Sequence, residues 1–146
     1  MARQDFNFFF PFRVRYAETD GQGVVFYGNY LIYYDTAISE YFRALPYDYM
    51  AEVKRTGADF HVVRASVDYK EPMLYDQVIE VGVRVSKIGR SSLTFAAAIF
   101  EQGGERLFST GEIVWVNTDQ TSHKSVPVWP DLVALIEKRE GGEVAA

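Results

Sequence analysis

The chain has 146 residues, no cysteine, and 15 basic against 20 acidic side chains, so its formal net charge is −5. This length fits one domain spanning residues 1–146, and the lack of cysteine excludes a disulfide framework, a thiolate metal site and a cysteine nucleophile. The longest apolar stretches are shorter than the roughly 20 residues that span a bilayer, and an acidic chain is a poor match for nucleic-acid phosphates. We therefore expect a cytoplasmic protein with no membrane span and no nucleic-acid partner.

Aromatic residues are unusually frequent in this chain. Ten Tyr, eleven Phe and two Trp make up 16% of it. Such a supply fills a thick core and leaves apolar surface for a pocket or for contact with another subunit.

The first predicted element is a strand over residues 8–16. Its alternate side chains are apolar and share one face: Phe8, Phe10, Phe12, Val14 and Tyr16. Pro11 within it indicates an edge strand or a bulge. A loop rich in turn residues follows over residues 17–23.

A long helix is predicted from Asn29 to Leu45, because apolar side chains recur there at three- and four-residue spacing. They are Leu31, Tyr34, Ile38, Tyr41, Phe42 and Leu45. Asn29 is the expected N-cap, and Pro46 is expected to end the helix. A shorter helix over residues 47–56 is expected to end at Gly57.

The rest of the chain is predicted to be mainly β-structure. Strands are expected over 61–70, 77–88, 91–102 and 106–116, and in the second of them Ile79, Val81, Val83 and Val85 point inward. A final helix opens at Pro130, and the tail 141–146 is expected to fray. These elements predict an α+β fold, a sheet with helices on one side. Pairing of an open sheet edge with a second copy would protect it, so we expect at least a dimer.

Several kinds of chemistry have no support in the sequence. The two histidines, His61 and His123, stand far apart and form no cluster with ligand spacing, so no metal site is predicted. A structural role is the preferred interpretation of His61. No Gly-rich phosphate loop and no Gly-x-Ser-x-Gly nucleophile elbow is present.

The strongest candidate site is the acidic, Gly-bearing loop before the long helix. Asp20 lies in this loop, and Tyr27 lies at the predicted helix entry seven residues later. Amides at a helix entry are unpaired donors that can stabilise a developing oxyanion, and a nearby carboxylate can attack the same carbonyl or activate a water. An acidic residue that merely forms the turn is the alternative interpretation of Asp20.

Three sequence blocks together are distinctive. They are TDGQGVV at 19–25 followed by YGNY at 27–30, VVRASVDYKEP at 62–72, and KIGRSSLTF at 87–95. In this order and spacing they resemble the 4-hydroxybenzoyl-CoA thioesterase family over residues 10–130, in particular its acyl-CoA thioesterase branch associated with the Tol–Pal system.

The resemblance implies a hotdog fold, in which an antiparallel sheet wraps around a long central helix. It implies homodimers or homotetramers with active sites at the subunit interface, and hydrolysis of acyl-CoA to a free acid and coenzyme A without a metal or other cofactor. The essential Asp of the family falls on Asp20, acting as nucleophile or general base, and its oxyanion amide falls on Tyr27. Many members have His at the position of Tyr27. Because the implied donor is a main-chain amide, this difference need not abolish catalysis, and we expect it to alter pocket shape or acyl preference. Asp35 is assigned no catalytic role.

Coenzyme A carries phosphates, which need cations or free amides. Lys87, Arg90 and Lys124 are the candidate substrate-binding residues, and solvated loop charge is the alternative interpretation of all three. Two rival functions also stay open: hydrolysis of acyl groups carried on acyl carrier protein, which the acidic surface disfavours, and non-catalytic binding of acyl-CoA.

Overall fold

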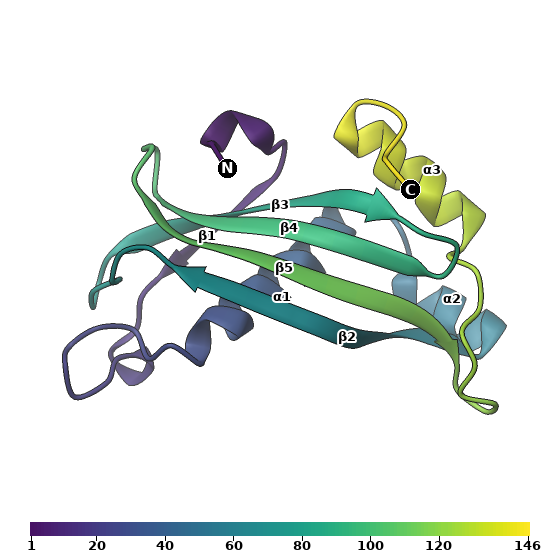
Figure 1. Ribbon diagram of the computed structural model, residues 1–146, viewed down its shortest axis with the longest axis horizontal. Coiled ribbons are helices and arrows are strands. Elements are labelled where there is room, and N and C mark those ends of the chain that lie inside the picture. Colours follow the sequence, from purple (N-terminus) through teal and green to yellow (C-terminus); the bar gives the residue numbers. More distant parts are fainter.

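The computed structural model describes residues 1–146 and contains three α-helices and five β-strands (Figure 1). The elements in chain order are β1 (Phe9–Arg13), α1 (Asn29–Ala44), α2 (Tyr49–Thr56), β2 (Ala58–Tyr69), β3 (Val78–Ile88), β4 (Ser92–Glu101), β5 (Leu107–Asp119) and α3 (Pro130–Glu140). Two short 3-10 helices cover Arg3–Asp5 and Tyr16–Glu18. No helix combines the length and the apolarity needed to cross a bilayer.

The five strands form one antiparallel sheet in the order β1-β3-β4-β5-β2, and α1 lies across one face of it (Figure 1). This is the hotdog arrangement, an α+β fold in which a sheet wraps around one helix. As Pro11 indicates, β1 is an edge strand. Strands β3, β4 and β5 pair in chain order, but β2 pairs with β5 and not with β3. Between β2 and β3 the chain crosses the end of the sheet, where Met73 is fully buried.

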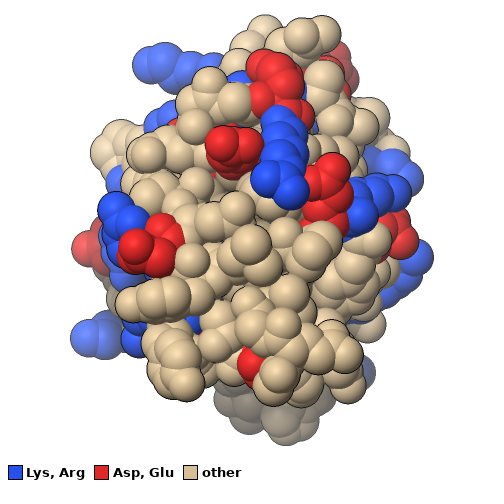
Figure 2. Space-filling view, turned by 90° about the vertical axis from the view of Figure 1, so that its left-hand side faces the viewer, with Lys and Arg blue, Asp and Glu red and all other residues tan.

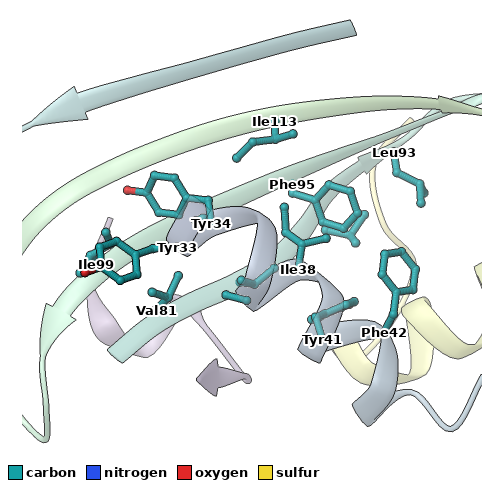
Figure 3. Close-up of a cluster of buried hydrophobic side chains, with 14 of the residues drawn as sticks. Tyr33, Tyr34, Ile38, Tyr41, Phe42, Val81, Leu93, Phe95, Ile99 and Ile113 are labelled. Carbon is teal, nitrogen blue, oxygen red and sulfur yellow. The ribbon is translucent and has the colours of Figure 1, made fainter. Parts of the chain in front are cut away.

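The aromatic stripe of α1 forms the centre of the core (Figure 3). The predicted residues Tyr34, Ile38, Tyr41, Phe42 and Leu45 are all buried, and the four predicted inward residues of β3 are at most 3% exposed. The periodicity prediction is wrong for Leu31, which is 41% exposed. Leu31 lies in the first turns of α1, beside the open edge of the sheet, where nothing in the chain covers it.

Three local predictions differ from the structure. The first strand ends at Arg13, and Tyr16 is exposed because it starts a 3-10 helix whose last residue, Glu18, accepts a hydrogen bond from Arg15 N. Asn29 is not the N-cap of α1: Gly28 occupies that position, and the Asn29 amide group donates to the carbonyl of Glu18. The C-terminal tail lies against β3, where the Ala145 carbonyl accepts a hydrogen bond from Ile88 N at 2.8 Å.

A close approach between α1 and β5 gives a stability prediction. A Cβ at Gly111 would lie 2.8 Å from the ring of Tyr34, and that ring is fully buried and held by a 2.6 Å hydrogen bond between its hydroxyl and Ser109 Oγ. Gly111→Ala is therefore expected to lower the free energy of unfolding by about 1–3 kcal/mol through overpacking. Urea unfolding measures this change.

The matched control is Gly104→Ala in the β4–β5 hairpin. There an added Cβ meets nothing closer than 3.8 Å, and the backbone does not require glycine. We expect a change within about 0.5 kcal/mol for this variant. Equal effects of the two substitutions would contradict the packing argument.

Candidate active site

A cleft of ≈350 Å³ lies at the end of the sheet where the loop before α1 meets the chain leaving β2. Ten residues line it: Asp20, Gln22, Val24, Val25, Tyr27, Tyr30, Tyr69, Lys70, Glu71 and Pro72. Two of the sequence-predicted site residues, Asp20 and Tyr27, are thus brought together. The structure therefore unites the acid and the helix entry in one solvent-accessible space.

Asp20 is held at the base of a tight hairpin. Its amide donates to Val24 O at 2.8 Å, and its carbonyl accepts from Gly23 N at 3.0 Å. Gly23 has φ +79°, a left-handed conformation that favours glycine. The side-chain Oδ1 accepts a hydrogen bond from Gln22 N at 2.8 Å, and Oδ2 accepts none from the protein. One carboxylate oxygen is therefore oriented by the loop, while the other is left for chemistry.

Tyr27 directly precedes the N-cap of α1. The backbone N–H groups of Tyr27 and Gly28 donate no hydrogen bond within the protein, and they lie at the positive end of the helix dipole. The Tyr27 carbonyl is fixed from the other side, because it accepts a hydrogen bond from the Tyr69 hydroxyl at 3.0 Å. Free donors at a fixed helix entry can stabilise the negative charge that develops on a carbonyl oxygen under attack.

The wall of the cleft is aromatic. The rings of Tyr30 and Tyr69 meet edge to face, with centroids 4.7 Å apart. Burial raises the pKa of both hydroxyls above their ordinary value, so both remain protonated donors at neutral pH. The end of the molecule that carries the cleft has few charged side chains over its lower half (Figure 2). The aromatic rings offer an apolar contact surface to an uncharged acyl group.

The three predicted phosphate-binding cations lie elsewhere in the same chain. Lys87, Arg90 and Lys124 are all exposed, and hydrogen bonds join the Arg90 and Lys124 segments to the end of β5. The end of β5 at Asp119 pairs with Ala58, the first residue of β2. The cleft lies beyond Tyr69, the last residue of β2. A strand of 12 residues is about 40 Å long. The structure therefore does not bring these cations to Asp20 within one chain.

Lys70 lines the cleft, but the sequence did not predict it as a substrate-binding residue. It follows the last residue of β2, and its amide donates to Phe108 O at 2.9 Å. Tyr69 and Tyr30 were missed in the same way. No local pattern marks these residues, because their place in the cleft depends on the pairing of β2 with β5.

A larger cavity, of ≈450 Å³, lies between α1 and α2 and includes Phe42, Tyr49 and Trp115. Its only acid, Asp48, is used to cap α2 by accepting a hydrogen bond from Ala51 N at 3.1 Å. None of the sequence-predicted site residues lines this cavity. The smaller cleft is therefore the better candidate for chemistry.

The two histidines do not contribute to either cavity. His61 Nε2 lies 2.9 Å from Gln120 Nε2, a surface contact at the far end of β2. Neither histidine joins a group of three metal-ligating side chains.

An antiparallel sheet wrapped around one long helix is the hotdog fold, which is shared by a class of thioester-hydrolysing enzymes. Comparison with known proteins then gives the family. The model of the thioesterase superfamily matches residues 22–108, which is more than half of the chain. The chain belongs to the thioesterase superfamily and is a thioester hydrolase, as its sequence blocks imply.

Individual relatives agree with this assignment. Acyl-CoA thioesterase YbgC of Haemophilus influenzae is 31% identical over 91 residues, which are 62% of this chain and 67% of that protein. Acyl-CoA thioester hydrolase YbgC of Escherichia coli is 28% identical over 127 residues, 87% of this chain and 93% of that protein. A solved DHNA-CoA thioesterase from Staphylococcus aureus has a TM-score of 0.80 and 28% identity, covering 94% of this chain and 96% of its own. The YbgC relatives fit the branch indicated by the sequence.

Proposed function

We propose that this protein hydrolyses acyl-CoA thioesters, with Asp20 as the catalytic carboxylate and the Tyr27 amide as the oxyanion donor. One observation carries the proposal: Asp20 and Tyr27 line the same cleft, and the Tyr27 N–H has no partner within the protein. The names of the YbgC relatives and of the Staphylococcus aureus enzyme support a coenzyme A thioester as substrate. No cofactor enters this scheme, because coenzyme A is part of the substrate.

Two routes make the same demands on these groups. In the first, an Asp20 oxygen attacks the thioester carbon, the C–S bond breaks and coenzyme A leaves as the thiolate; water then hydrolyses the acyl–Asp20 anhydride to the free acid and restores the carboxylate. In the second, Asp20 accepts a proton from water as the water oxygen attacks, and the departing sulfur takes up that proton. In both routes the carbonyl oxygen gains negative charge at the Tyr27 amide.

We propose further that the working form is at least a homodimer joined along β2. β1 pairs only with the first half of β3, so the second half of β3 has no strand on that side. Its N–H groups there are already used: Val83 donates to Phe8 O, Val85 to the Glu140 carboxylate and Ile88 to Ala145 O. The sheet ends at β1 and at β2, and β2 is the longer open edge, with 12 residues against 5 in β1. An open strand edge of this length invites pairing with another chain.

The side chains near this edge support the same conclusion. Val62, Val63 and Ile32 are 57%, 60% and 60% exposed, and a small apolar groove between α1 and β2 is lined by Leu31, Val62, Ala65 and Ile113 among others. Exposed apolar side chains grouped around a bare edge mark a subunit contact.

A dimer of this kind would also give the predicted cations a role. If two β2 strands pair antiparallel, the Ala58 end of one strand lies towards the Tyr69 end of the other. Arg90 and Lys124 of one subunit then approach the cleft of its partner, where coenzyme A phosphates need cations. A location in the cytoplasm is part of this proposal and is supported by the absence of cysteine.

A thiol-release screen tests the proposed activity. Acetyl-, octanoyl-, palmitoyl- and benzoyl-CoA are offered to the purified protein, and the best acyl group is offered again on acyl carrier protein. We expect thiol release from at least one CoA thioester, with the carrier-protein substrate slower because an acidic carrier is repelled by an acidic enzyme. Faster turnover of the carrier-protein substrate would show that acyl carrier protein, and not coenzyme A, carries the natural acyl group. Binding of acyl-CoA without thiol release from any substrate would show a non-catalytic acyl-CoA-binding protein.

A further inference from the structure

A second carboxylate, Glu18, lies two residues before Asp20 and differs from it in that both of its oxygens are hydrogen-bonded within the protein. Its side chain is 13% exposed. Glu18 Oε1 accepts hydrogen bonds from the Tyr33 hydroxyl at 2.6 Å and from Arg15 N at 2.8 Å, and Oε2 is contacted by the Arg15 guanidinium. Both oxygens of Glu18 are thus occupied, and Glu18 does not line the cleft. It is not a group that attacks substrate.

The main chain of Glu18 makes a second set of contacts with the same region. Its carbonyl oxygen accepts from Phe26 N and from Asn29 Nδ2, both at 2.9 Å. Phe26 immediately precedes the oxyanion residue Tyr27, and Asn29 is the first residue of α1. Glu18, at the start of the loop that carries Asp20, is therefore hydrogen-bonded both to Phe26 at the end of that loop and to Asn29 of α1.

The two residues of α1 that bind Glu18, Asn29 and Tyr33, are themselves fixed on the helix. Asn29 and Tyr33 are four residues apart, so they lie on one face of α1, one turn apart. Tyr33 is 3% exposed, and its ring packs edge to face on Phe12 of β1 with centroids 5.2 Å apart. Tyr33 is therefore anchored in the core while its hydroxyl reaches the loop.

Glu18 is held as a charged acceptor. Burial acts to raise the pKa of its carboxyl, but hydrogen bonds from Arg15 N, Tyr33 and the Arg15 side chain outweigh burial and lower the pKa below its ordinary value. An ionised carboxylate forms stronger hydrogen bonds than a neutral group does. The contact with Tyr33 is consequently a firm one at neutral pH.

From these contacts we infer that Glu18 and Tyr33 are positioning residues, which fix the Asp20 loop on the first turns of α1 so that the acid faces the Tyr27 amide. This inference rests on the proposed function. Its physical basis is that catalysis depends on sub-ångström placement of the acid relative to the reacting carbon, and a displacement of about 1 Å can reduce the rate about 100-fold.

The molecule offers a closely matched control on the same helix. Tyr41 also donates its hydroxyl to a carboxylate, Glu140 Oε2, at 2.6 Å, and that carboxylate also accepts a backbone N–H, from Val85. The Tyr41 ring packs edge to face on Phe8 at 5.6 Å. Tyr33 and Tyr41 therefore differ mainly in what their carboxylate holds: the Asp20 loop in one case, and the C-terminal end of α3 in the other.

The experiment compares Tyr33→Phe with Tyr41→Phe, using the CoA thioester that the wild type hydrolyses fastest. Both variants are expected to lower the melting temperature, because each leaves a carboxylate without one donor. Only Tyr33→Phe is expected to lower kcat, by about 10- to 100-fold, with KM changed less than about twofold. Glu18→Ala should lower kcat in the same way, and Glu18→Gln should retain more activity because its amide oxygen still accepts from Tyr33.

Equal kcat values for Tyr33→Phe and Tyr41→Phe would overturn the inference. Its failure is distinguishable from failure of the proposed function, because the latter is decided by Asp20→Asn. A second measurement, amide hydrogen exchange at Phe26, does not depend on activity. Exchange there is expected to be faster in Tyr33→Phe and unchanged in Tyr41→Phe, and unchanged exchange in Tyr33→Phe would equally overturn the inference.

Discussion

Replacing Asp20 by Asn is expected to lower kcat for acyl-CoA hydrolysis by about 10²–10⁴-fold, the range that a positioned acid or base contributes. The amide group of Asn can neither form an anhydride nor accept a proton from water. Its Oδ1 can still accept the hydrogen bond from Gln22 N that orients Asp20. The hairpin should therefore persist, and the melting temperature should stay close to that of the wild type.

Thiol release from the best CoA substrate, measured beside a thermal melt, checks this result. Glu143→Gln is the control, because Glu143 is an exposed acid in the C-terminal tail that lies outside both the cleft and the groove beside β2. This control is expected to keep kcat within about threefold, a typical effect for a surface change. Near wild-type turnover by Asp20→Asn would remove Asp20 from the mechanism.

Replacing Val63 by Arg is expected to separate the subunits and, with them, most of the activity. Val63 is 60% exposed and sits at the bulge of β2, where two residues of β2 oppose one of β5. Burying an unpaired guanidinium in an apolar contact costs several kcal/mol. A separated subunit lacks the cations of its partner, and the loss of two charge-assisted hydrogen bonds to phosphate should lower kcat/KM about 100-fold or more.

Sedimentation velocity and kcat/KM at one protein concentration measure the two effects together. Ala134→Arg is the control, since Ala134 is also exposed but lies on α3, which packs against β3 and not against β2. It should remain dimeric and active. A monomeric Val63→Arg variant with full activity would show that each chain carries a complete site, and a dimeric, active variant would show that the subunits do not meet at β2.

Most predictions that depended on neighbouring residues agree with the structure, although those for Tyr16, Asn29 and Leu31 do not. The burial of Tyr34 and Tyr41 on α1 follows from the helical period, and the inward residues of β3 follow from simple alternation. Asp20 and Tyr27 meet in one cleft because only six residues separate them and the hairpin returns the chain at once. The distance between two residues so close in the chain is set by the turn at Gly23 and by the start of α1 at Asn29.

Where the prediction depended on strand order, it was incomplete. The sequence contains no local signal that β2 pairs with β5, so Tyr69 and Lys70 could not be placed beside Asp20. Tyr16 continues the alternation of apolar and polar residues that predicts the first strand. In the structure it begins a 3-10 helix, in which Glu18 accepts a hydrogen bond from Arg15 N. The distance between the cleft and the cations Arg90 and Lys124 likewise became visible only with the full sheet.

The sequence by itself determined most of the elements, the inward face of β3 and the nearness of Asp20 to the entry of α1, because each depends on residues within about two helical turns of one another. Only the tertiary structure decided which strand edge stays bare, which side chains wall the cleft, and that Glu18 and Tyr33 hold the loop. These features require contacts between segments far apart in the chain, such as Tyr69 with Tyr27, and their formation depends on the packing of the whole sheet around α1.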